Sequence, residues 1–272
     1  MTAGAFIHRR EEQGIVTLIL NQPDSLNRFR STQQFIELAE HIHSANANPR
    51  VKVLIITGRG KAFCAGGDLN QMATRKGFSE GSVADVHDRY RETIHLLPRA
   101  LACADVPTIA AINGAAYGAG FDLACFCDIR IAAASATFSA SFARLGIVAG
   151  DGGAWILPRL LGRSRAMELA FTADPIDAEK AKKIGLVSEV VADNALVQHA
   201  ECLAQRIARH PGRAMRIHKR LLRDAEQQSL LQHLDSVAAY QAILHTTDEH
   251  VQAVRRTIGS IGRGNSWRLE GT

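Results

Sequence analysis

The chain has 272 residues, 46% of them hydrophobic and 22% charged, with a formal net charge of +5, which is ordinary for a globular protein with a buried core. No apolar run approaches the roughly 20 residues that a bilayer span needs, so a membrane protein is excluded. The N-terminal stretch has no apolar signal core and the five cysteines form no Cys-x-x-Cys pair, so a reduced, cytoplasmic protein is expected.

Strand and helix patterns alternate along the first two thirds of the chain. Residues 16–20 and 53–57 are predicted as buried strands because β-branched and aliphatic residues fill them. A helix capped by Ser31 separates them and carries its apolar residues on one face. Further helical patterns cover residues 83–103 and 120–127, and further strands cover residues 108–112 and 129–133. This alternation predicts an α/β core.

After about residue 193 only helical patterns follow. They cover residues 194–209, 212–225, 229–244 and 248–257. We therefore expect two parts, a core over residues 1–193 and a helical C-terminal module over residues 194–272. The last stretch, residues 259–272, is glycine-bearing and polar and is expected to be loosely held.

One stretch of the C-terminal module is strongly basic. Residues 206–223 contain seven Arg or Lys and no acid. The stretch fits a solvated helix face, a site for a phosphate-bearing ligand, or a nucleic-acid surface. No aromatic residue is interleaved with these charges, so nucleic acid is the least favoured of the three.

Two glycine-bearing turns follow predicted strands. Residues 61–69 read KAFCAGGDL, and residues 112–124 read INGAAYGAGFDLA. Small residues let the backbone turn tightly and approach a ligand closely. The second turn opens a helix, whose first amides are unpaired and favour negative charge. Two such turns aimed at one point could hold a thioester carbonyl and stabilise its enolate, although glycine turns often serve only as turns.

Other signatures of chemistry are incomplete. Residues 58–61 lack the upstream glycine of a phosphate loop, and no Gly-x-Ser-x-Gly elbow occurs. The eleven histidines form no zinc-type constellation. Cys125 and Cys127 have no histidine nearby in sequence to complete a metal site, so they are interpreted as buried structural residues, and no metal is expected.

The two glycine turns, at this separation, resemble the oxyanion-hole motifs of the enoyl-CoA hydratase/isomerase (crotonase) superfamily. The resemblance extends over nearly the whole chain, through residues 20–27, 127–132, 145–153, 157–162 and 178–190. It implies a spiral core of ββα turns and an acyl-CoA substrate, with no cofactor beyond the coenzyme A of that substrate. It also implies homotrimers, commonly paired into hexamers, packed through the helical module.

The resemblance assigns the oxyanion amides to Gly67 and Ala119. Ala119 stands where the family usually has glycine. Only its N–H would be used, so alanine is tolerated there if its φ stays negative.

The resemblance also implies a path for coenzyme A. Ala65, Asp68 and Leu69 would lie along its adenine and pantetheine, while Leu26 and Arg28 would approach from the other side. Asp68 has a second interpretation as a turn or helix cap, and one residue can do both.

The expected acid–base residues depart from the family pattern. Hydratases of this family use two glutamates, and the matching positions here are Asp122 and Phe142. Phe142 transfers no proton, so Asp151 is the candidate substitute. Our first hypothesis is therefore addition of water to a 2-enoyl-CoA with Asp122 and Asp151 as the acid–base pair. Helix capping is the alternative for both aspartates.

Other readings stay open. The nearest is a double-bond isomerase with a single carboxylate; another is an RNA-binding or scaffolding homologue without activity, and a third is a hydrolase or dehalogenase with Asp151 as nucleophile. His87, Tyr90 and His95 fall in a region that lines the acyl pocket in the family, but surface or core roles are favoured for them. Arg144 could bind an acidic acyl group, and a surface salt bridge is the favoured interpretation.

Overall fold

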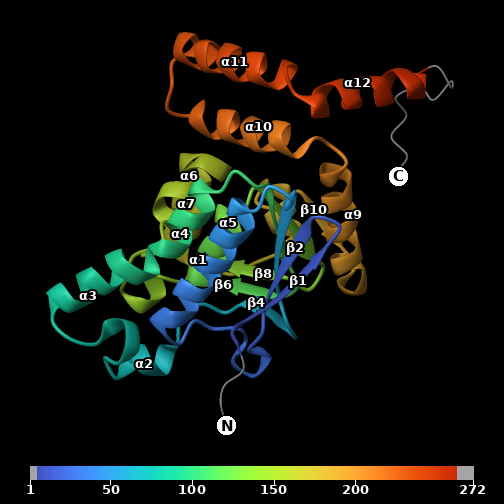
Figure 1. Ribbon diagram of the computed structural model, residues 1–272. Coiled ribbons are helices and arrows are strands. Elements are labelled where there is room, and N and C mark those ends of the chain that lie inside the picture. The colour runs from blue at the N-terminus through green and yellow to red at the C-terminus, as the bar shows by residue number, and fades with distance from the viewer. Residues whose placement is uncertain (1–4, 262–272) are drawn as a thin grey trace.

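Buried aliphatic strands form a six-stranded sheet in the computed structural model, which describes residues 5–261 (Figure 1). Only the first pair, β1 and β2, is antiparallel; the other neighbours are parallel. In sheet order the strands are β1 (Ile7–Glu12), β2 (Ile15–Leu20), β3 (Val53–Gly58), β5 (Thr108–Ile112), β7 (Ile129–Ala133) and β10 (Glu189–Val191). The four strands predicted from the sequence are β2, β3, β5 and β7.

A second sheet has four short strands. In order they are β4 (Ala62–Cys64), β6 (Ala115–Tyr117), β8 (Thr137–Ser139) and β9 (Ile176–Asp177). The parallel strands β3, β5 and β7 of the large sheet are each followed in the chain by a strand of the small sheet. The expected α/β spiral of ββα turns is therefore confirmed.

Helices surround the two sheets. As predicted, Ser31 caps α1 (Thr32–Ala47), whose buried face carries Phe35, Leu38, Ala39 and Ile42. The long helix predicted over residues 83–103 is divided into α3 (Val83–Arg89), a π-helical turn (Tyr90–Ile94) and α4 (Leu96–Cys103). The remaining core helices are α2 (Leu69–Ala73), α5 (Ala119–Phe126), α6 (Gly153–Leu161), α7 (Arg163–Thr172) and α8 (Ala178–Lys183), with short 3-10 turns at Pro23–Ser25, Gly77–Ser79, Ala143–Leu145 and Asp193–Ala195.

Within residues 5–261, four helices follow residue 195, as expected. Helix α9 (Leu196–Ala208) packs on the large sheet, where Leu196, Ala200 and Ala204 share a buried cluster with apolar side chains of the strands. Helices α10 (Gly212–Asp224), α11 (Leu230–His245) and α12 (Asp248–Ile261) lie beyond it (Figure 1). The division into two parts after residue 193 stays a prediction. Residues 262–272 of the expected loose tail lie outside the described residues.

The basic stretch faces inward along α10. Arg216 donates hydrogen bonds to the carbonyl oxygens of Asn46, Asn48 and Val51, at 2.8, 3.0 and 2.9 Å. These carbonyls belong to the end of α1 and to the loop that leads to β3. Three more basic side chains of α10 contact the core in the same way: Lys219 bonds Val106 and Asp128, Arg220 bonds Asp105, and Arg223 bonds Ala102. Much of this charge therefore attaches α10 to the core.

Two further expectations concern the cysteines and membrane spans. Cys125 and Cys127 are buried and form no disulfide, as predicted. No helix within residues 5–261 is both long enough and apolar enough to cross a bilayer.

Candidate active site

The first glycine turn connects β4 to α2. Gly66 has φ +82, and a Cβ on it would lie 2.7 Å from the carbonyl oxygen of Tyr117, so only glycine fits this approach. The turn is tied to an earlier loop, because the Ala65 amide donates to the Leu26 carbonyl at 3.0 Å. The Phe29 amide donates in turn to the Gly66 carbonyl at 2.8 Å. The amide of Gly67 is left without a backbone partner among residues 5–261.

The second glycine turn lies against the first. Gly118 has φ 51 and caps α5, whose first residue is Ala119. A Cβ on Gly66 would lie 3.7 Å from the Ala119 amide nitrogen, and a Cβ on Gly118 would lie 4.0 Å from the Gly66 Cα. Ala119 is helical and has no positive φ, as its alanine requires. Its amide is one of the unpaired donors of the first helical turn, so two free amides lie at the junction of the two turns.

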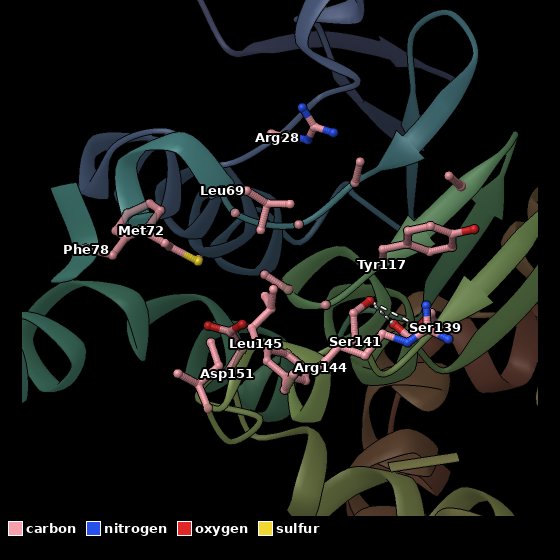
Figure 2. A pocket seen from close by; sticks show the side chains of 18 of the residues that line it. Arg28, Leu69, Met72, Phe78, Tyr117, Ser139, Ser141, Arg144, Leu145 and Asp151 are labelled. Atoms are coloured by element: carbon pink, nitrogen blue, oxygen red, sulfur yellow. Dashed lines mark hydrogen bonds between the residues drawn. The ribbon is translucent and has the colours of Figure 1, made fainter. Parts of the chain in front are cut away.

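A cavity of about 350 Å³ opens at this junction. Of the nine site residues predicted from the sequence, seven line it: Leu26, Arg28, Ala65, Gly67, Leu69, Ala119 and Asp151. Figure 2 shows Arg28 on one side of the cavity, with Asp151 and Leu145 on the opposite side. The Nε of Arg28 is buried without a hydrogen-bond partner among the described residues.

Asp68, which does not line the cavity, caps α2. Its carboxylate accepts hydrogen bonds from the amides of Asn70 and Gln71 and pairs with Arg30 at 3.0 Å. The capping interpretation of Asp68 is therefore realised, and a contact with coenzyme A stays a prediction. Its pKa lies below the ordinary value because these hydrogen bonds and the Arg30 charge outweigh the opposing effect of desolvation, which is the largest single contribution.

Asp122 lies behind the cavity. It is 1% exposed, and its Oδ2 accepts a hydrogen bond from the Gly153 amide at 3.0 Å. Gly153 is the first residue of α6, so Asp122 satisfies a free amide of a helix other than its own. Burial, and then the nearby carboxylate of Asp151, raise its pKa well above the ordinary value.

Asp151 lies at the surface of the cavity, and its carboxylate accepts no hydrogen bond within residues 5–261. The alternative role of capping α6 is not realised by Asp151, because the cap residue is Gly152 and the amide of Gly153 is bound by Asp122 instead. Burial raises the pKa of Asp151 to about 7. Since the Asp151 charge opposes ionisation of the more buried Asp122, we expect Asp151 to ionise first.

Phe142 is the residue that the sequence resemblance matches to the second family glutamate. It lines the cavity, and its ring atoms lie 3.9 Å from where a Cβ on Gly118 would be. An apolar ring therefore lies over the glycine turn, at the residue for which the resemblance implied a carboxylate.

The turn that carries Asp151 is contacted by Tyr90 and His95, for which surface or core roles were favoured from the sequence. The ring of Tyr90 packs on Gly150, where an added Cβ would lie 2.5 Å from the Tyr90 Cε1 atom. The Nε2 of His95 lies 3.0 Å from the Gly150 carbonyl oxygen. Tyr90 also lines the cavity, and its pKa is raised by burial and by the charge of Asp151. Both side chains fall within the helix predicted over residues 83–103; Tyr90 begins the π-helical turn and His95 directly follows it.

Several cavity residues had no signal in the sequence. Met72 and Phe78 come from α2 and the turn after it (Figure 2), and the Met72 methyl lies 2.5 Å from where a Cβ on Gly67 would be. Arg144 lines the cavity and pairs with the exposed Asp174 at 2.9 Å, as the salt-bridge interpretation expected. No group of three metal-ligating side chains gathers among residues 5–261.

Comparisons of the sequence and of the structure with known proteins agree on one family. A family model described as "Enoyl-CoA hydratase/isomerase" matches residues 10–256. The 1,2-epoxyphenylacetyl-CoA isomerase of Escherichia coli K12 is 36% identical over 249 residues, covering 92% of this chain and 94% of that protein. A probable enoyl-CoA hydratase of Rhodobacter capsulatus is 37% identical, covering 74% and 75%. The crystal structure of an enoyl-CoA hydratase from Bacillus anthracis matches with a TM-score of 0.83 at 33% identity, covering 93% and 96%.

Proposed function

Because the chain belongs to the enoyl-CoA hydratase/isomerase family, we propose that it moves the double bond of an enoyl-CoA thioester, with Asp151 as the proton-transferring group. The reaction is a double-bond isomerisation, the second of the two reactions predicted from the sequence. Hydration, the first, is retained below as the second candidate.

The glycine turns supply the electrophilic half of the proposed site. The thioester carbonyl oxygen accepts hydrogen bonds from the Gly67 and Ala119 amides, which strengthen as negative charge develops on that oxygen. Each such donor contributes on the order of a hundredfold or more in rate to comparable reactions. Removal of a proton from the α-carbon then gives a dienolate whose charge is held at this oxygen.

Asp151 supplies the basic half. In its ionised form it takes a proton from the α-carbon of a 3-enoyl-CoA, and the carboxylic acid so formed delivers that proton to the γ-carbon. The double bond moves into conjugation and the carboxylate is regenerated, so no other reactant is needed. A base with a pKa of about 7 suits this exchange near neutral pH.

One observation carries this choice: of the two buried aspartates, only Asp151 lines the cavity. Asp122 accepts the Gly153 amide, and Phe142 provides a ring in place of a second acid. Two-carboxylate hydration needs two such groups around one water. A single-carboxylate proton shift needs one.

Hydration stays the second candidate because the two aspartates are electrostatically linked. The charge of Asp151 raises the pKa of Asp122, as expected for neighbouring carboxyl groups that could share a proton and hold a water. Relatives with hydratase names are also among the similar proteins.

Two assays separate these reactions. The purified protein is incubated with a 3-enoyl-CoA and, separately, with crotonyl-CoA, while the absorbance of the conjugated thioester is followed. Isomerisation increases the signal with the first substrate, and hydration decreases it with the second. If neither isomerisation nor hydration is detected and free coenzyme A is released instead, both reactions are overturned. That result would favour a hydrolase that uses Asp151 as nucleophile.

We also propose that coenzyme A runs between the Leu26–Arg28 side and the Ala65–Leu69 side of the cavity. The unpartnered Nε of Arg28 supports an anionic or carbonyl-bearing neighbour on its side.

Homotrimers or dimers of trimers are proposed through α11 and α12, where Leu230, Leu231 and Ile258 are 70%, 74% and 64% exposed. The RNA-binding alternative loses its main support, because four of its seven basic residues bind the core.

A further inference from the structure

A second and larger cavity adjoins the first. It measures about 1120 Å³ and lies between the α2–α3 segment and the loop before Asp151. We infer that it receives the far end of the acyl group and selects acyl groups that end in a carboxylate. This inference rests on the proposed function only in so far as the first cavity holds the thioester of an acyl-CoA.

The two cavities lie side by side, and we take their shared boundary as the passage for the acyl chain. Six residues line both: Leu69, Met72, Phe78, Tyr90, Leu145 and Ile147. Most of these are apolar, so the passage suits the methylene groups of an acyl chain. The added volume exceeds the need of a short acyl group such as crotonyl, and it lies on the Asp151 side of the site.

The charged side chains of the second cavity have one sign. Its ionisable lining residues besides Tyr90 are His87, Arg91, His95 and Arg99, and no carboxylate lines it among residues 5–261. These residues come from α3, the π-helical turn, His95 directly after that turn, and α4. The other elements around the cavity, α2, the 3-10 turn Gly77–Ser79 and the loop before Asp151, contribute no charged lining residue. The cavity is therefore apolar in its passage and basic at its outer wall.

The two guanidinium groups lack acidic partners. Neither Arg91 nor Arg99 forms an ion pair with a carboxylate among the described residues, and Arg99 makes one long hydrogen bond, 3.4 Å, to the Arg91 carbonyl. The nearby acid Asp88 is paired with His87, and Glu92 lies outside the lining. By contrast, Arg144 in the first cavity is already paired with Asp174.

This pattern discriminates between acyl groups. A chain that ends in a methyl group would place apolar surface against two exposed guanidinium groups that have no acidic partner among the described residues. A terminal carboxylate would instead form charge-assisted hydrogen bonds with a guanidinium, which binds carboxylates with two parallel N–H donors. The ligand class is thus a coenzyme A thioester of a dicarboxylic acid.

Binding of saturated thioesters tests this inference without any chemical step. Calorimetry compares adipyl-CoA, suberyl-CoA and sebacyl-CoA with hexanoyl-CoA, octanoyl-CoA and decanoyl-CoA, which match them in chain length. We expect the carboxylate member to bind at least about tenfold more tightly in one or more pairs at low salt, the gain of one charge-assisted hydrogen bond. Equal affinities in every pair would overturn the inference.

Variants locate the effect. In an Arg91→Ala/Arg99→Ala double variant, the affinity for the preferred dicarboxylyl-CoA should fall to that of its methyl-ended counterpart. Arg75→Ala/Lys76→Ala is the matched control, since it removes two exposed charges from the same region that do not line either cavity. A preference that survives in the first variant, or is lost equally in the control, would contradict the assignment. A binding preference without turnover of the unsaturated thioesters would remove the proposed reaction and leave this inference intact.

Discussion

The carboxylate of Asp122 accepts a hydrogen bond from the amide of Gly153, 3.0 Å away, and so joins α5 to the start of α6. Helix α5 begins with Ala119, which offers one of the two free amides, and α6 begins two residues after Asp151. The bond therefore fixes the position of the proposed base relative to the proposed oxyanion site. We interpret Asp122 as a positioning residue on this ground.

The pH dependence of the reaction should follow the ionisation of Asp151. Burial raises its pKa to about 7, and the base is the ionised form, which predominates above that pH. We expect kcat/KM to rise about tenfold per pH unit below pH 7 and to level off above it. Initial rates of isomerisation from about pH 5 to about pH 9 give the profile, and a flat profile over that interval would contradict the assignment.

The free energy of unfolding should change with pH in the opposite direction to the rate. A carboxyl group whose folded-state pKa is raised stabilises the fold below its unfolded pKa, and this stabilisation is lost as pH rises through the folded pKa. For Asp151 the window runs from 3.8 to about 7. The neutral Asp151→Asn variant should therefore gain stability relative to wild type as pH rises, by roughly 4 kcal/mol at most for a shift of about three units. Urea unfolding of both proteins at several pH values measures it; a constant difference would contradict the expectation.

Gly150→Ala should misplace Asp151 without unfolding the protein. The new Cβ would lie 2.5 Å from the Tyr90 ring, so the ring or the turn must shift. Displacement of a reacting group by about 1 Å costs on the order of a hundredfold in rate, and we expect kcat to fall by about ten- to a hundredfold. Gly259→Ala is the control, because nothing lies within 4 Å of its added Cβ. Equal rates in the two variants would show that the Gly150 contact does not position Asp151.

Arg216→Ala should destabilise the attachment of α10. The side chain satisfies the carbonyls of Asn46, Asn48 and Val51, and its removal leaves them to be satisfied by water at a half-buried surface. We expect a loss of about 2 kcal/mol in the free energy of unfolding. Arg213→Ala removes an exposed charge from the same helix and should change little. Equal effects of the two substitutions would mean that the net charge of the stretch, rather than these hydrogen bonds, determines the free energy of unfolding.

The parts of the fold that sequence periodicity predicts are the long ones. Strands β2, β3, β5 and β7 and helix α1 have enough residues to show a repeat, and each lies where it was expected. The small sheet was not predicted element by element, because strands of two or three residues have no period. The π-helical turn was missed for a related reason, since one extra residue hardly changes a helical apolar pattern.

The site, too, has parts that the sequence predicts and parts that only the fold reveals. Gly67 and Ala119 were assigned through the resemblance of two glycine-bearing motifs, which are local in sequence, and both line the cavity. The roles of Asp122 and Asp151 depend instead on which carboxylate faces the cavity, and residues about thirty positions apart reveal this only in the fold. Capping was an alternative for both, but the cap residues of α5 and α6 are Gly118 and Gly152; Asp122 instead accepts a hydrogen bond from the first amide of α6.

The central claim, that Asp151 alone transfers the proton, is tested most directly by comparing Asp151→Asn with Asp122→Asn in the conversion of a 3-enoyl-CoA to its conjugated isomer. An asparagine at 122 keeps an oxygen that can accept the Gly153 amide, so that variant should retain kcat within about tenfold of wild type. Asp151→Asn removes the base and should lower kcat by at least about a hundredfold. Equal, large losses in both variants, or an unimpaired Asp151→Asn protein, would contradict the claim.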